Sequence, residues 1–196
     1  MPLDGPAEPW RSFLTELDAQ LDAPVDFHCI GGFVVSQHYG MGRETADLDV
    51  LAVIPREVAE HVVQLAGKGS ALQKKYRVYI DHVGVANYPA EYEGRLVRAF
   101  PVWPKVRLWA LEPHDLALTK LGRSIERDIR DVIFLAQAGL IDHDTLVARF
   151  ETELEPYIVG RTPAWHRTAN SVGAYAIDPA TATLTLADSN QLPFFG

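Results

Sequence analysis

Two glycines and two aspartates have the types and spacing that could carry chemistry. Gly31 and Gly32 follow an expected strand at 25–30, and Asp47 and Asp49 begin the next one. Strand side chains at i and i+2 point the same way, which puts both carboxylates on one face, about 6 to 7 Å apart. Because such like charges repel, the pair indicates a bound cation, and Mg²⁺ prefers oxygen ligands.

The glycine pair offers a place for phosphate beside these carboxylates. Without Cβ atoms, Gly31 and Gly32 let a polyanion approach the backbone, and a helix expected at 33–39 would add amide donors and a positive dipole end. Taken singly, a Gly-Gly pair is an ordinary turn and Asp-x-Asp an ordinary loop end. In this order, with strand, helix and strand between them, they favour a phosphate and metal site.

A third carboxylate, Asp81, lies in an otherwise apolar strand expected at 78–86. A buried charge is costly unless it has a partner, so the strand pattern predicts one for Asp81. That partner is either a metal ion or, as the alternative, a salt bridge with Arg77 or Arg107.

These residues resemble the DNA polymerase β-type nucleotidyltransferase superfamily. Its mark is a Gly-Gly or Gly-Ser turn, then Asp-x-Asp or Asp-x-Glu, then a carboxylate on a later strand. The stretch 115–136 (DLALTKLGRSIERDIRDVIFLA) is similar to bacterial AbiEii-type nucleotidyltransferases, the toxin-like branch that includes the MenT proteins. The likeness covers roughly residues 27–138.

The resemblance implies roles for the glycines and the three aspartates. Gly31 and Gly32 would hold the triphosphate of an NTP, while Asp47, Asp49 and Asp81 would bind two Mg²⁺ ions, with Mn²⁺ as an alternative. Asp81 would also lie near the attacking hydroxyl and receive its proton. Nucleotidyl transfer suits such a site, because paired metals stabilise both the entering and the departing oxygen.

Four further residues are candidates by position. Arg43 and Thr45 precede the aspartate pair and could hydrogen-bond phosphate or order the loop; for Thr45 a turn role is an equal alternative. Lys120, on a helix expected at 113–123, would reach the β- or γ-phosphate in the AbiEii-type pattern. Otherwise its leucine neighbours predict a lysine that snorkels from an amphipathic helix.

The helix expected at 124–138 supplies the fourth candidate, Asp128. Its predicted apolar face consists of Ile125, Ile129, Val132, Ile133 and Ala136. Asp128 lies on the flank of this face, which predicts a partner for Lys120 or for a substrate group. Asp131 lies almost opposite the centre of the face, which predicts pairing with Arg127 or solvent.

Composition bounds the class of protein. The 196 residues are 47% apolar and 22% charged, which excludes disordered and fibrous classes. No apolar run approaches the ~20 residues of a membrane helix. One cysteine, Cys29, excludes an intrachain disulfide. The start of the chain does not resemble a secretory leader, so a cytoplasmic location is expected.

Charge and metal-ligand patterns add two observations. The net charge of −8 argues against coating duplex nucleic acid and leaves a local basic groove open. Two basic groups fit either solvated faces or a guide for RNA or a phosphorylated substrate: Arg123, Arg127 and Arg130, and Arg95, Arg98, Lys105 and Arg107. A transition-metal site at His28, Cys29 and His38 is disfavoured, because neighbouring strand residues point to opposite faces.

The expected architecture is an α/β polymerase β-like nucleotidyltransferase fold, a mixed β-sheet flanked by helices with a helical C-terminal part. A nucleotidyltransferase domain spans 1–140, with an N-terminal helix at 9–22. A C-terminal helix follows at 141–160. An appendage at 161–196, whose order is left open, contains one strand-like alternation, TATLTLA.

The expected function is Mg²⁺-dependent transfer of a nucleoside monophosphate from an NTP to an acceptor hydroxyl. The acceptor is an RNA 3′ end such as that of tRNA, a protein side chain or a small molecule, and the preferred NTP, ATP included, is left open. The AbiEii likeness alone implies a toxin restrained by a cognate antitoxin. The alternatives are a catalytically silent nucleotide- or partner-binding module and a phosphohydrolase using the same carboxylates.

Overall fold

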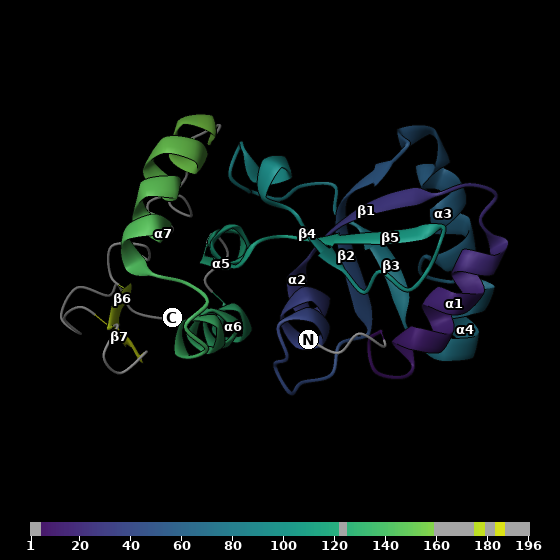
Figure 1. The fold of residues 1–196 in the computed structure, drawn as a ribbon, viewed down its shortest axis with the longest axis horizontal. Helices are drawn as coiled ribbons and strands as arrows, with labels where there is room; N and C mark the ends of the chain where they lie inside the picture. The colour runs from purple at the N-terminus through teal and green to yellow at the C-terminus, as the bar shows by residue number, and fades with distance from the viewer. Residues whose placement is uncertain (1–4, 122–124, 159–174, 179–182, 187–196) are drawn as a thin grey trace. The chain divides into compact units, whose positions relative to one another are not determined.

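The structure is a computed structural model that describes residues 5–121, 125–158, 175–178 and 183–186. The chain divides into two compact units, Met1–Ala86 with Glu93–Glu112 and Asn87–Tyr92 with Pro113–Gly196. The elements up to the division after Glu112 are α1 (Trp10–Gln20), β1 (Val25–Ile30), α2 (Gly31–Phe33), the π-helical turn η1 (Val34–His38), β2 (Asp47–Ile54), the 3₁₀ turn η2 (Arg56–Val58), α3 (Ala59–Ala66), α4 (Ala71–Tyr76), β3 (Tyr79–His82), the 3₁₀ turn η3 (Tyr92–Arg95), β4 (Val97–Ala99) and β5 (Val106–Ala110). Those after it are α5 (Pro113–Leu121), α6 (Glu126–Gln137), α7 (His143–Arg149), the π-helical turn η4 (Phe150–Leu154), the 3₁₀ turn η5 (Glu155–Tyr157), β6 (Tyr175–Asp178) and β7 (Thr183–Leu186) (Figure 1).

The first unit contains a five-stranded sheet in the order β3-β2-β1-β5-β4. β1 runs parallel to β5 and antiparallel to β2, β2 is parallel to β3, and β4 is antiparallel to β5. The expectation of a mixed sheet with helices is therefore confirmed. β1 has the predicted bounds, whereas β3 covers only four residues of the segment expected at 78–86.

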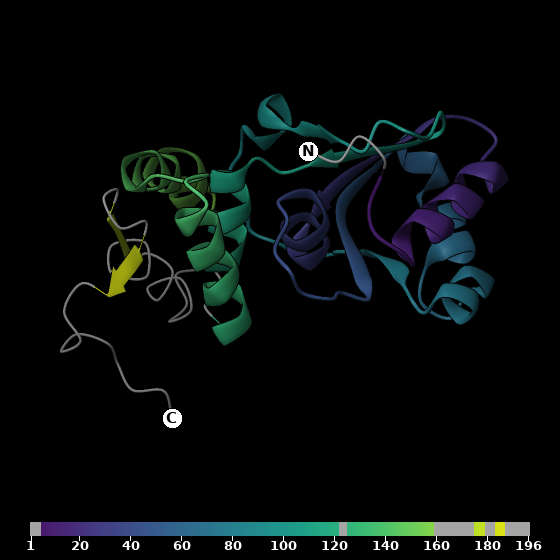
Figure 2. The same ribbon diagram turned by 60° about the horizontal axis from the view of Figure 1, so that its bottom comes forward.

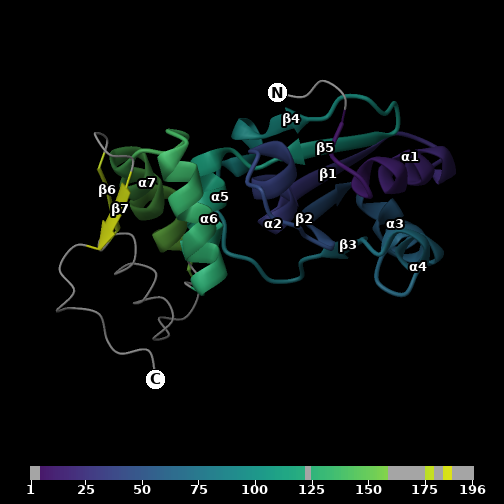
Figure 3. The same cartoon turned by 90° about the horizontal axis from the view of Figure 1, so that it is seen from below.

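One face of this sheet is apolar and is covered by α1, α3 and α4 (Figures 1 and 3). Because strand side chains alternate, each strand contributes every second residue to this core face. Phe27 of β1, Leu48 of β2 and Leu108 of β5 are almost completely buried there. α1 meets them with residues at helical spacing, Trp10, Phe13, Leu14 and Leu17. The opposite face of the sheet, which we call the polar face, carries the charged side chains.

A β-bulge in β2 separates its two halves. His28 pairs with Ala52 and the next residue, Cys29, pairs with Val50, so Leu51 has no partner on β1. Val53 and Val50 are both buried although they are three residues apart. The unmatched residue lets Val53 and Val50 share the core face while Asp49 keeps to the polar face.

The second unit contains the helices α5, α6 and α7 (Figure 2). The expected nucleotidyltransferase domain at 1–140, which would include α5 and α6, stays a prediction. β6 and β7 pair antiparallel, and β7 falls within the alternation TATLTLA. The rest of the appendage lies outside the described residues.

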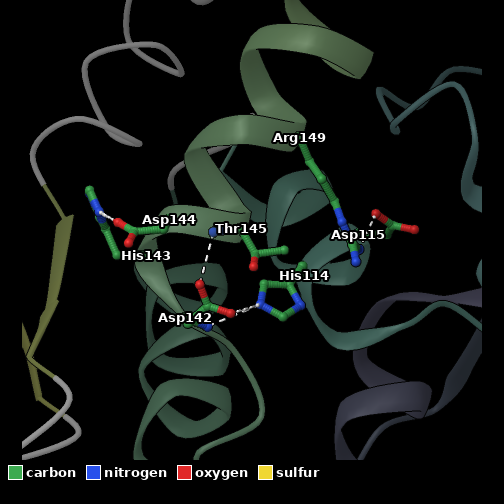
Figure 4. Close-up of polar contacts among 7 residues, drawn as sticks. All are labelled: His114, Asp115, Asp142, His143, Asp144, Thr145 and Arg149. Atoms are coloured by element: carbon green, nitrogen blue, oxygen red, sulfur yellow. Dashed lines mark hydrogen bonds and ion pairs between the residues drawn. The ribbon is translucent and has the colours of Figure 1, made fainter.

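Polar contacts fix α7 to α5 within this unit (Figure 4). Asp142 caps α7, since its Oδ1 accepts the Thr145 backbone N–H at 2.8 Å. That hydrogen bond is the main reason why the pKa of Asp142 is lowered. His114 Nε2 lies 3.0 Å from the Asp142 backbone nitrogen, and Arg149 Nη1 donates to Asp115 Oδ1 at 2.9 Å.

Candidate functional site

The start of α2 and the start of β2 lie side by side, at the end of the sheet where β1 finishes and β2 begins. Because β1 and β2 are antiparallel, the last residue of β1, Ile30, pairs with Asp49. The next residue, Gly31, has φ +73, a left-handed conformation that favours glycine. A Cβ on Gly31 would lie 2.0 Å from Asp49 Oδ2. Glycine at this position therefore lets the backbone turn into α2 directly against a carboxylate.

The second glycine lies against the loop residues that the sequence singled out. A Cβ on Gly32 would lie 2.8 Å from Arg43 Nη2 and 3.2 Å from Thr45 Oγ1. Thr45 Oγ1 in turn donates a hydrogen bond to Asp47 Oδ1 at 2.6 Å. The structure thus gathers both glycines, the arginine, the threonine and the aspartates at one place.

Asp81 joins this group through the sheet register. β3 is parallel to β2, with Asp81 opposite Asp49 and Tyr79 opposite Asp47, so all four side chains share the polar face. Asp81 is exposed, and the expectation that it is buried within its strand is wrong. β3 is an edge strand of the sheet. Because the Asp81 side chain is exposed there, its charge needs no buried partner.

The alternative salt bridge of Asp81 with Arg107 is also absent. Arg107 Nη2 instead donates to Asp26 Oδ2 at 2.6 Å. The carboxylate of Asp81 is therefore not paired with Arg107.

Tyr79 is a residue of the site that the sequence reasoning did not single out. Burial raises its pKa, and the charges of Asp47, Asp81 and Asp49 raise it further, because tyrosinate would face three carboxylates. The available signal was its spacing of two residues from Asp81 on one strand. The strand register places Tyr79 beside Asp47 and on the same face as Asp49 and Asp81.

The donor chemistry of the site suits a hard cation completed by substrate. In the described part of the chain, no group of three or more His, Cys, Asp or Glu side chains is placed so that it could hold a metal ion. Mg²⁺ is commonly held by one or two carboxylates together with substrate phosphates and waters. Asp47 and Asp49, beside the glycines, supply that kind of partial ligand set.

Aromatic contacts hold the helix that follows the glycines. Phe33 of α2 packs edge to face on Trp10 of α1, with ring centroids 4.8 Å apart. At the other end, the Tyr39 hydroxyl donates to the Leu111 carbonyl at 2.7 Å. α2 continues into η1, so the first amides of one helical segment begin at the glycine pair. This places a positive dipole end beside the carboxylates.

Lys120 and Asp128 lie in the second unit, where they form a buried ionic cluster with Asp131. Lys120 Nζ lies 2.6 Å from Asp131 Oδ2 and 3.6 Å from Asp128 Oδ1. The three side chains are 0 to 1% exposed. Lys120 therefore does not snorkel to solvent.

The prediction that Asp128 is a partner of Lys120 is confirmed, whereas the predicted position of Asp131 is wrong. Asp131, expected to face Arg127 or solvent, makes the shorter contact with Lys120. The buried face of α6 consists of Asp128, Asp131, Val132, Leu135 and Ala136, while Ile125 is 47% exposed. A lysine from α5 pairs with the carboxylates on this face, so two of the five residues of the buried stripe are charged.

The remaining metal-ligand candidates belong to the core. Burial raises the pKa of the Cys29 thiol to about 12. His38 is also buried, with its ring edge-on to Tyr39 and Phe100. The His38 ring therefore makes packing contacts with its neighbours.

A mixed sheet with a glycine turn and strand carboxylates on one face is the arrangement expected of a nucleotidyltransferase. Residues 12–167 match the model of a family described as a nucleotidyltransferase of unknown function (DUF6036), and the chain belongs to this family. Comparisons with curated proteins and with solved structures gave no match. The narrower likeness to AbiEii-type proteins stays a prediction. Among the described helices, none combines the length and apolarity needed to cross a membrane.

Proposed function

We propose that this protein transfers a nucleoside monophosphate from an NTP to an acceptor hydroxyl, with Mg²⁺ as cofactor. The observation that carries the proposal is the meeting of Gly31 and Asp49, where a Cβ would lie 2.0 Å from the carboxylate oxygen. Binding of an NTP with Mg²⁺ requires a turn that admits phosphate and, next to it, a carboxylate that holds the cation. The family assignment supports the same activity.

Each residue of the site has a role in this proposal. Asp47 and Asp49 would bind Mg²⁺, which neutralises phosphate charge and stabilises the departing oxygen. Gly31, Gly32 and Arg43 would bind the triphosphate through backbone amides and a guanidinium.

Asp81 would accept the proton of the acceptor hydroxyl. The acceptor oxygen forms a bond to the α-phosphorus, the bond from that phosphorus to the bridging oxygen breaks, and pyrophosphate leaves. The exposure of Asp81 supports this role, because the acceptor must approach from solvent.

The first experiment is thermal unfolding with each of the four NTPs, with and without Mg²⁺. A ligand at 100 times its Kd stabilises the native state by about 2.7 kcal/mol. We expect a Mg²⁺-dependent rise for wild type that is lost in the Asp47→Asn, Asp49→Asn double variant. Asp22→Asn, at an exposed position after α1, is the matched control and should keep the rise.

Turnover distinguishes the alternatives. Label from an α-labelled NTP should appear on an acceptor with wild type and not with Asp81→Asn, which should still bind NTP. Binding with no transfer to any acceptor would favour the silent binding module. Release of phosphate without a transferred product would favour the phosphohydrolase.

The toxin role and its antitoxin remain predictions from the AbiEii likeness of residues 115–136. Expression of the protein without a partner should then arrest growth, and expression of the Asp47→Asn, Asp49→Asn variant should not. Normal growth with wild type would contradict the toxin role and leave the transferase proposal intact.

A further inference from the structure

A second group of side chains lies on the polar face, across the strands β1, β5 and β4. The register places His28, Trp109 and Arg98 in one row across these strands, and Asp26 and Arg107 in the next. We call these five residues the Arg98 row. Because residues two apart on a strand share a face, all five point to the side that carries Asp49.

Asp26 fixes two members of the Arg98 row. Its Oδ1 accepts the Trp109 indole N–H at 2.7 Å, and its Oδ2 accepts from Arg107 Nη2 at 2.6 Å. One carboxylate thus orients an aromatic ring and a guanidinium together. Both oxygens are engaged, and neither contact involves Arg98.

Arg98 is held by stacking instead. Its guanidinium carbon lies 5.2 Å from the centroid of the Trp109 ring, a cation–π arrangement. Burial lowers the pKa of Arg98, and the nearby charge of Arg107 lowers it further. In the described part of the chain, Arg98 Nη1 and Arg107 Nε are buried without a hydrogen-bond partner. Beside one carboxylate, the two guanidinium groups therefore keep two N–H groups without a hydrogen-bond partner among the described residues, and the charge of Glu93 also acts on His28 of the same row.

The Arg98 row lies two to three nucleotide lengths from the carboxylates. Ile30 pairs with Asp49, and His28, two residues earlier on β1, pairs with Trp109. Two strand spacings and one two-residue step put the Cα atoms of Asp49 and Trp109 about 12 Å apart, and Asp81, one strand further on, is about 16 Å from Trp109. A polymer that reaches Asp81 with its terminal hydroxyl would therefore place its second or third nucleotide on the row.

We propose that the Arg98 row binds a phosphate and a base of a single-stranded RNA whose 3′ hydroxyl is the acceptor. This rests on the proposed function and names its acceptor class. Guanidinium planes and aromatic rings stack on unpaired bases, and guanidinium forks bind phosphodiesters. Of the acceptors named above, an RNA supplies an unpaired base and a phosphodiester in one molecule.

The test measures binding of a fluorescently labelled, mixed-sequence single-stranded RNA by anisotropy over a range of salt. Arg98→Ala should weaken binding about tenfold, with a salt slope shallower by about 0.7 for one lost phosphate contact. Arg98→Lys should keep the slope and recover part of the affinity. Arg11 is an exposed residue of α1, the helix that covers the opposite face of the sheet. The Arg11→Ala variant should therefore bind RNA as wild type does.

A second readout does not depend on how Arg98 variants fold. The chain has four tryptophans, and RNA should quench the fluorescence of wild type more than that of Trp109→Phe. Equal RNA binding by wild type and Arg98→Ala, with equal quenching, would overturn the proposal.

NTP binding separates this inference from the proposed function. Arg98→Ala should keep the Mg²⁺-dependent thermal rise with NTP. Loss of that rise with unchanged RNA binding would assign the row to the base of the NTP and overturn the RNA proposal. If wild type shows no NTP rise but binds RNA through Arg98, the transferase proposal fails and the RNA site stands.

Discussion

The carboxylate of Asp49 occupies the space into which a side chain on Gly31 would project. Only 2.0 Å separates Asp49 Oδ2 from the Cβ position of this glycine, which has φ +73. The two residues are adjacent through the pairing of β1 with β2, although 17 residues separate them in the sequence. The position of the Asp49 carboxylate therefore depends on glycine at residue 31.

Gly31→Ala should abolish the Mg²⁺-dependent thermal rise with NTP, because the methyl group displaces the Asp49 carboxylate. The left-handed backbone adds a stability cost of about 1 to 2 kcal/mol. Gly69→Ala is the matched control, since Gly69 has φ +90 and no atom within 4 Å of its Cβ position. It should lose similar stability and keep NTP binding. Equal NTP binding by Gly31→Ala and wild type would contradict the assignment.

Thr45→Val should weaken Mg²⁺-dependent NTP binding by about 10- to 100-fold, the range for loss of a residue that orients a metal ligand. The Thr45 hydroxyl donates to Asp47 Oδ1, and valine leaves that carboxylate unoriented. Calorimetric titration with NTP and Mg²⁺ measures the change. Thr152→Val, which removes an exposed hydroxyl bonded to a helix carbonyl, should bind NTP as wild type; the same loss in both variants would mean that the effect is not local.

Lys120→Met should destabilise the fold by about 3 to 5 kcal/mol in chemical denaturation, because it leaves buried carboxylates without their cation. Adding Asp131→Asn should recover part of this loss. Arg130→Ala, which breaks an exposed ion pair with Glu126 on the same helix, should cost less than about 0.5 kcal/mol.

Lys120 also tests the role implied by the AbiEii likeness. If the double variant Lys120→Met, Asp131→Asn folds and still shows the NTP-dependent rise, Lys120 is a structural residue. Loss of that rise in a folded double variant would support contact with phosphate.

Stability should fall as the pH decreases below about 6.5, the usual histidine pKa. Burial lowers the pKa of His38, so the unfolded chain takes up a proton at a higher pH than the folded one. The contribution is complete above pH 6.5 and is lost as the pH falls toward the lower folded pKa. His38→Gln should flatten this dependence in urea unfolding, while His61→Gln, at an exposed position on α3, should leave it unchanged.

Local signals were sufficient for much of the sheet and for the glycine turn. Pro24 and Gly31 bracket β1, which has the predicted bounds, and Ser70 caps α4 as a helix starting near it requires. Gly32, Arg43 and Thr45 were expected near Asp47 from their order alone, and the structure brings them together.

What the sequence could not supply were contacts between elements. The apolar pattern of α6 could not reveal that Lys120 on α5 pairs with Asp131. The prediction therefore assigned the wrong face of α6 to the core. The apolar neighbours of Asp81 suggested burial, but exposure depends on the strand's place in the sheet, and β3 lies at its end. The spacing of Tyr79 from Asp81 places both on one face, but the pairing of Tyr79 with Asp47 depends on how β3 aligns with β2.

The unmatched Leu51 gives β2 one residue more than the segment of β1 that it pairs with. Loss of Leu51 would leave Val50 and Val53 two residues apart, the spacing of one strand face, so β2 would pair with β1 without a bulge. Loss of Leu48 would instead turn Asp47 toward the apolar layer, because a shift of one residue turns every side chain to the other face. We therefore expect relatives to vary in length at Leu51 and to keep the spacing of Asp47 and Asp49.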